Sequence, residues 1–102
     1  MISEEITALA LAVHARSASP NVGAPGSDDD IRFLALSMAG EAGEAANIVK
    51  KAWRDGKPLN REKLAEEIAG TACYLVGLAS AIDLDLNEEM RRQMAAFEAR
   101  PR

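Results

Sequence analysis

The chain has 102 residues, enough for one domain with a modest core, which we place over residues 1–102. Hydrophobic residues make up 48% of it but aromatic residues only 4%, a composition that favours packed helices over a sandwich or barrel. The net charge of −4 argues against a nucleic-acid polymer as partner. The single Cys73 allows no internal disulfide and fits a reducing compartment.

The N-terminal segment is acidic, where a signal peptide would be basic. No apolar run reaches the roughly 20 residues that cross a bilayer. We therefore expect a cytoplasmic protein with no membrane partner.

A first helix is predicted over residues 2–16, with Ser3 as its N-cap. His14 is the only histidine, and no second His or Cys accompanies it. We interpret it as a helix-terminal residue rather than a catalytic one.

Residues 17–28 carry two prolines and two glycines and predict a flexible loop. The acids at 28–30 resemble a metal cluster, but Ser27 and Asp30 have the spacing of a capping box. Acids also favour a helix N-terminus, so we interpret this run as the start of a helix.

The second helix is predicted from about Asp29 to Arg54, with Gly56 and then Pro58 ending it. Its last turns carry three cations, Lys50, Lys51 and Arg54. Such cations usually complement the helix dipole on a solvated face. Binding of a phosphate group is the second interpretation.

The third helix is predicted from about Arg61 to Ile82, with Asn60 as its cap. Residues 68–82 contain no charge and many small side chains. A helix that is apolar all round must be buried all round, and this predicts a helix-mediated homo-oligomer, in the simplest case a homodimer. A fourth helix is expected from about Glu88 to Ala99, giving an all-α, antiparallel four-helix bundle.

The stretch Gly40-Glu41-Ala42-Gly43-Glu44 is unusual inside the second helix. Glycine within a helix costs about 1 kcal/mol relative to alanine. Glu41 lies in the line of the apolar stripe, and Glu44, three residues on, is its neighbour on the same face. Carboxylates are rarely buried unless they are paired or hold a metal. This pattern points to a cation site.

Glu67 is the third acid of interest, because it borders the apolar stripe of the third helix. Glu44 lies about 12 residues before the turn and Glu67 about 10 after it, so in an antiparallel pair they sit at similar heights. Oxygen-only ligands favour Mg²⁺ or Mn²⁺ over zinc. The alternative is that Glu67 is a solvated first-turn acid and Glu41 pairs with Lys63 or an arginine.

Over residues 34–86 the sequence resembles the MazG-type, all-α nucleoside triphosphate pyrophosphohydrolases. The likeness rests on the Glu-x-x-Glu of Glu41 and Glu44, the 22 residues that follow, and the second acidic helix with Glu67. The resemblance implies a helical homodimer or homotetramer that holds Mg²⁺ through these three glutamates. It also implies hydrolysis of an NTP or dNTP to the monophosphate and pyrophosphate.

The second motif of that family is Glu-x-x-Asp, and here Gly70 replaces the aspartate. We expect Glu41 or Glu44 to orient or deprotonate the attacking water. The candidates for binding the phosphate tail of the nucleotide are the three cations at the end of the second helix, Lys50, Lys51 and Arg54. Trp53 is a candidate for stacking on the base, with a place in the core as the other interpretation. Because the second motif lacks its aspartate, the alternative function is a non-catalytic or weakly active nucleotide-binding or oligomerisation protein.

Overall fold

The structure is a computed structural model that describes residues 3–9 and 24–101. Residues 4–9 are helical, and three longer helices follow: α2 (Asp28–Asp55), α3 (Arg61–Ala81) and α4 (Leu86–Glu98). The described residues contain no strand. The predicted all-α fold is confirmed.

The first helix and α2 begin at the caps that the sequence predicts, Ser3 and Ser27. The Ser3 hydroxyl accepts a hydrogen bond from the Ile6 N–H at 3.1 Å. At the start of α2, the Ser27 hydroxyl accepts from the Asp30 N–H at 3.3 Å, and the Asp30 carboxylate accepts from the Gly26 N–H at 2.9 Å. His14 and residues 17–23 of the predicted loop lie outside the described residues.

The turn between α2 and α3 is set by local chemistry. Gly56 has the left-handed φ of 63° that glycine adopts without strain, and the Lys57 N–H donates to the Ala52 carbonyl at 3.0 Å. Asn60 Oδ1 then accepts from the Lys63 N–H at 3.0 Å and starts α3. The short turn makes α2 and α3 antiparallel neighbours.

The last helix begins earlier than predicted, at Leu86 rather than near Glu88. The reason is the cap: the Asp85 carboxylate accepts a hydrogen bond from the Glu88 N–H at 3.1 Å. Asp83, in the preceding turn, has a φ of 54°.

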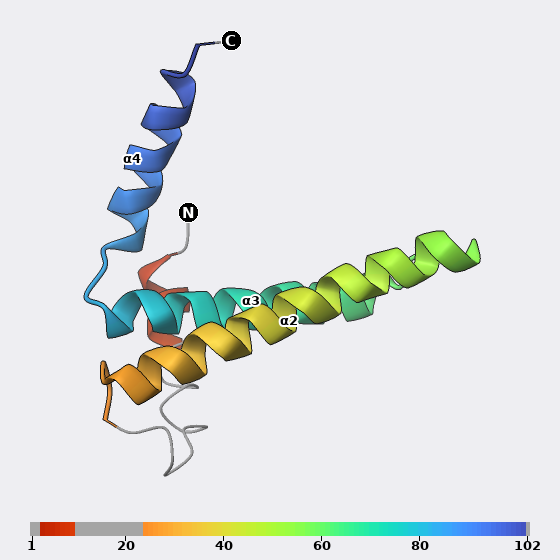
Figure 1. Ribbon diagram of the computed structural model, residues 1–102, viewed down its shortest axis with the longest axis horizontal. Helices are drawn as coiled ribbons and strands as arrows, with labels where there is room; N and C mark the ends of the chain where they lie inside the picture. The colour runs from red at the N-terminus through yellow and green to blue at the C-terminus, as the bar shows by residue number, and fades with distance from the viewer. Residues whose placement is uncertain (1–2, 10–23, 102) are drawn as a thin grey trace.

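Figure 1 shows α2 and α3 side by side, with α4 projecting away from them. The axes of α3 and α4 differ by 101°. The radius of gyration is 16.0 Å, against about 13 Å for a compact domain of this length. The described residues of one chain therefore form a helical hairpin with an arm, rather than a closed four-helix bundle.

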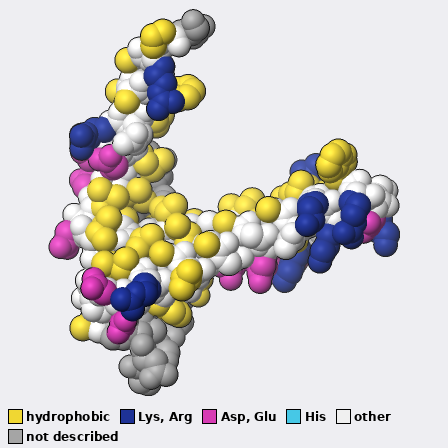
Figure 2. Space-filling model, viewed as in Figure 1, with side chains coloured by type: hydrophobic (Ala, Val, Ile, Leu, Met, Phe, Trp, Pro, Cys, Tyr) yellow, Lys and Arg dark blue, Asp and Glu magenta, His cyan; other side chains and the backbone are white. Residues whose placement is uncertain are grey.

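Few apolar side chains are buried within the described part of one chain. Leu34, Val76 and Ala79 are the buried hydrophobic residues, and Phe33 packs edge-on against Tyr74 with ring centroids 6.2 Å apart. The charge-free half of α3 is not covered all round, since Ile68 is 57% exposed. Figure 2 shows apolar side chains over the angle between α4 and the hairpin, and along α4 itself.

Within the described ranges, no single helix has the length and apolar character needed to cross a membrane. By length and composition alone, α3 and α4 pass that test when taken together, as a pair bent by 101°. The cytoplasmic location stays a prediction.

Candidate metal centre

Three glutamates meet across the α2–α3 hairpin. One carboxylate oxygen from each of Glu41, Glu44 and Glu67 lies within 4.8 Å of the other two. Glu44 is exposed, Glu41 is half-buried and Glu67 is only 7% exposed. The convergence expected from their heights along the two helices is confirmed, and we call these residues the glutamate triad.

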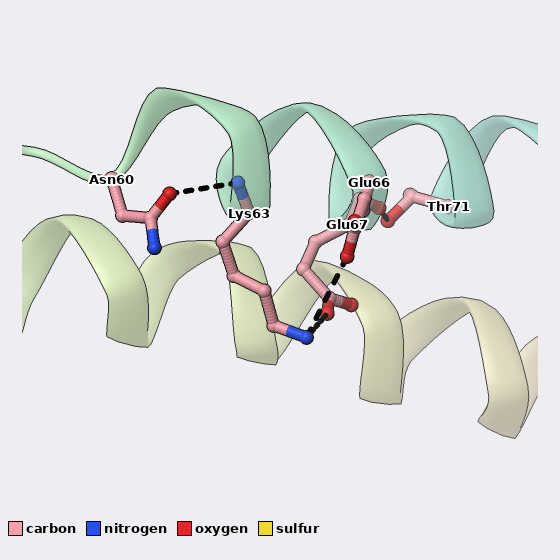
Figure 3. A network of polar contacts seen from close by, with 5 residues as sticks. All are labelled: Asn60, Lys63, Glu66, Glu67 and Thr71. Carbon is pink, nitrogen blue, oxygen red and sulfur yellow. Dashed lines mark hydrogen bonds and ion pairs between the residues drawn. The ribbon is translucent and has the colours of Figure 1, made fainter.

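Secondary structure and the turn together bring the triad into place. Glu41 and Glu44 are three residues apart and so share one face of α2. Glu67 lies on α3, and Figure 3 shows its side chain and that of Lys63 pointing from α3 toward α2. On the same helix the Thr71 hydroxyl donates to the Glu67 carbonyl at 2.8 Å.

Lys63 belongs to the site and was missed as a site residue by the sequence analysis. Its ammonium lies 3.7 Å from a carboxylate oxygen of Glu66 and 3.7 Å from one of Glu67. The spacing of Lys63 and Glu67, four residues on one helix, is the signal that identifies such a pair.

The alternative interpretation of these acids is wrong on two counts. Glu67 is buried rather than a solvated acid. The ion pairs of Lys63 go to Glu66 and Glu67 rather than to Glu41.

The proximity of three acids shifts their proton affinities. A hydrogen bond to Glu67, followed by burial and by repulsion from neighbouring carboxylates, raises the pKa of Glu41. A second hydrogen bond, between Glu44 and Glu67, and the charge of Glu67 raise the pKa of Glu44. The pKa of Glu67 is lowered, because its carboxylate accepts hydrogen bonds from Glu41 and Glu44 and faces Lys63. The α2 side of the triad therefore has a higher proton affinity than the α3 side.

A shallow cavity of about 310 Å³ opens beside the triad. Lys51 and Lys63 contribute positive charge to its wall, and Asn47 contributes an amide that the sequence analysis did not single out. Its lining residues are Glu44, Asn47, Ile48, Lys51, Lys63 and Glu67. The cavity therefore brings two acids of the triad together with two cations.

The other predicted substrate-binding residues are placed differently. Arg54 is engaged by Asp55, with Nε 2.8 Å from a carboxylate oxygen, and this hydrogen bond raises the pKa of the guanidinium. Trp53 is 86% exposed, so its interpretation as a core residue is wrong within one chain. Lys50 is exposed as well. Of the three predicted cations, Lys51 is the one that lines the cavity.

The donor set of the triad fits a hard divalent cation. It offers three carboxylates and no sulfur or imidazole, which is the chemistry that Mg²⁺ and Mn²⁺ prefer. Three carboxylates at this spacing also repel one another, and a cation removes that repulsion. Position 70, the aspartate position of the resembling family, is a glycine that faces Glu41 across the hairpin.

The fold and the site define an all-α protein with a carboxylate cluster between two antiparallel helices. The chain is 31% identical over 85 residues to the "Gene 37 protein" of Mycobacterium phage L5, covering 79% of this chain and 75% of that protein. The chain belongs to the family of that phage protein. The name of the phage protein states no activity. No protein-family model and no solved structure matches the chain.

Proposed function

We propose that this protein is a divalent-cation-dependent nucleoside triphosphate pyrophosphohydrolase. It would convert an NTP or dNTP and water into the monophosphate and pyrophosphate. The observation that carries the proposal is the convergence of Glu41, Glu44 and Glu67 from two helices, beside a cavity with two lysines. The resemblance to MazG-type enzymes over residues 34–86 supports the same reaction.

The triad has two tasks in this proposal. Glu41, Glu44 and Glu67 would hold Mg²⁺ or Mn²⁺, which would supply positive charge against the triphosphate and the leaving pyrophosphate. Glu41 or Glu44 orients the attacking water and accepts its proton. The bond between the α- and β-phosphates breaks as water attacks.

Positive charge beside the triad supports an anionic substrate. Six of the chain's twelve Lys and Arg residues lie between positions 50 and 63, although the chain as a whole has a net charge of −4. Figure 2 shows basic side chains gathered at the end of the hairpin that these residues form. Lys51 and Lys63 are the nearest candidates for the phosphate tail. The exposed Trp53 is available to stack on a base.

The proposal also includes a second copy of the chain. Apolar side chains on α4, such as Met94 and Phe97, are 60% and 69% exposed, and Leu36 on α2 is 72% exposed. Exposed apolar surface of this extent marks an interaction face. A homodimer or homotetramer would bury it, and sedimentation equilibrium at micromolar concentration tests this directly. A clean monomer would contradict it.

A panel of NTPs and dNTPs with Mg²⁺ or Mn²⁺ tests the activity. We expect pyrophosphate release with at least one nucleotide, and we expect Glu44→Gln to remove it. The absence of turnover with every nucleotide would overturn the hydrolase assignment.

A second candidate function is nucleotide binding without hydrolysis. The observation that favours it is Gly70, which removes one carboxylate from the motif of the resembling family. Calorimetry with the same nucleotides separates the two candidates, since binding without turnover supports only the second.

A further inference from the structure

We infer that Gly70 is a positioning residue: its missing side chain leaves the space that the Glu41 carboxylate occupies. The inference rests on the cation site proposed above. On this inference the triad is a three-carboxylate site in which a side chain at position 70 would displace the Glu41 carboxylate.

The inference stands on the distances around Gly70. A Cβ atom built on this residue would lie 2.6 Å from Glu41 Oε2, 3.3 Å from its Cδ and 3.6 Å from its Cγ. A contact of 2.6 Å is well inside van der Waals distance, so any side chain at position 70 requires the Glu41 carboxylate to retreat. Ordinary contact begins at 3.4 Å, which sets the retreat at about 0.8 Å.

A retreat of that size matters for binding but little for folding. Binding constellations need their groups within about 0.5 Å of the productive geometry. The displaced atom, however, is the end of a flexible side chain, and Glu41 is half-buried at the surface of the hairpin. The helix backbone can therefore stay in place while the ligand atom moves.

Two other glycines provide matched controls. Gly40 and Gly43 also lie inside a helix, on either side of Glu41, and a Cβ on either would meet nothing within 4 Å. Replacing any of the three glycines by alanine improves helix propensity to a similar degree. Only the change at position 70 intrudes on the triad.

The same geometry decides what an aspartate at position 70 would do. Its Cβ would displace Glu41 as an alanine Cβ does, and it would add a fourth negative charge to the cluster. Gly70→Asp should therefore weaken cation binding rather than restore a lost ligand.

The experiment is calorimetric titration of Mn²⁺ into the full chain, with thermal unfolding of the metal-free protein as a second readout. We expect Gly70→Ala to bind Mn²⁺ about tenfold or more weakly, the scale of disturbing a metal ligand's support. Gly43→Ala should bind like wild type, and both variants should unfold at or above the wild-type temperature. Equal Mn²⁺ affinity in wild type and Gly70→Ala would overturn the inference.

A double-mutant cycle asks whether Gly70 acts through Glu41. If it does, Gly70→Ala in a Glu41→Ala background should cause no further loss of Mn²⁺ affinity. Independent, additive losses would overturn the positioning role, because they would show an effect that does not pass through Glu41. A wild-type chain that binds no Mn²⁺ would overturn the cation site itself, and this inference with it.

Discussion

Glu67→Gln tests the buried member of the triad while preserving the shape of the side chain. Glu67 is 7% exposed and contributes one of the three oxygens that lie within 4.8 Å of one another. Removing its charge should abolish stabilisation of the protein by Mg²⁺ or Mn²⁺. The assay is thermal unfolding with increasing cation concentration, since a ligand that binds only the folded state raises its melting temperature.

The expected size of the shift follows from chain length. A cation at about one hundred times its dissociation constant stabilises the folded state by about 2.7 kcal/mol. For 102 residues, with an unfolding entropy of about 2.1 cal/mol/K per residue, this raises the melting temperature by about 13 °C. Wild type should show a shift of this order, and Glu67→Gln should show almost none.

Glu66→Gln is the matched control. Glu66 also lies 3.7 Å from the Lys63 ammonium, but its side chain is 63% exposed, and it lies about 100° around the helix from Glu67. This variant should keep the wild-type shift. The reasoning is refuted if Glu67→Gln keeps it too, or if both variants lose it equally, because cations would then be responding only to general surface charge.

Three further predictions concern the site, the core and the surface of α4. Because the pKa values of Glu41 and Glu44 are raised and a protonated carboxyl is a poor ligand, Mn²⁺ affinity should decline as the pH falls through those raised values. In calorimetry the decline should begin above the ordinary glutamate value of 4.5, and a decline confined to lower pH would contradict it. Leu34 is only 1% exposed, so Leu34→Ala should lower the free energy of unfolding in urea by about 2–5 kcal/mol. A near-zero change would show that Leu34 is not part of the core. Phe97→Glu, at a residue 69% exposed, should weaken self-association about tenfold or more in sedimentation equilibrium without lowering helicity; an unchanged association constant would remove Phe97 from the interface.

The features that the sequence predicted best are those set by local chemistry. Ser27 and Asn60 start helices because their side chains accept hydrogen bonds from backbone N–H groups of the first turn. Gly56 ends α2 because it adopts a left-handed backbone angle without strain. The convergence of Glu44 with Glu67 was also predictable, because a short turn fixes antiparallel packing and helical rise then fixes height.

The features that were not predictable depend on tertiary geometry. The direction of α4 is set by the backbone of the short turn around Asp83, whose φ of 54° no simple sequence rule requires. Trp53 lies in the last turn of α2, and its 86% exposure depends on what packs around that turn, which the helical spacing alone does not give. The short distance between Gly70 and Glu41 emerges only when the two helices are packed together.

Phosphorus NMR of a dNTP incubated with the protein tests the central claim most directly, because it identifies the bond that is broken. With Mg²⁺ or Mn²⁺ present, we predict that the triphosphate signals give way to a nucleoside monophosphate and pyrophosphate in equal amounts. We also predict that Glu67→Gln prevents the change. Persistence of the triphosphate with every nucleotide, or formation of a diphosphate and orthophosphate, would contradict the claim that the glutamate triad serves pyrophosphohydrolysis.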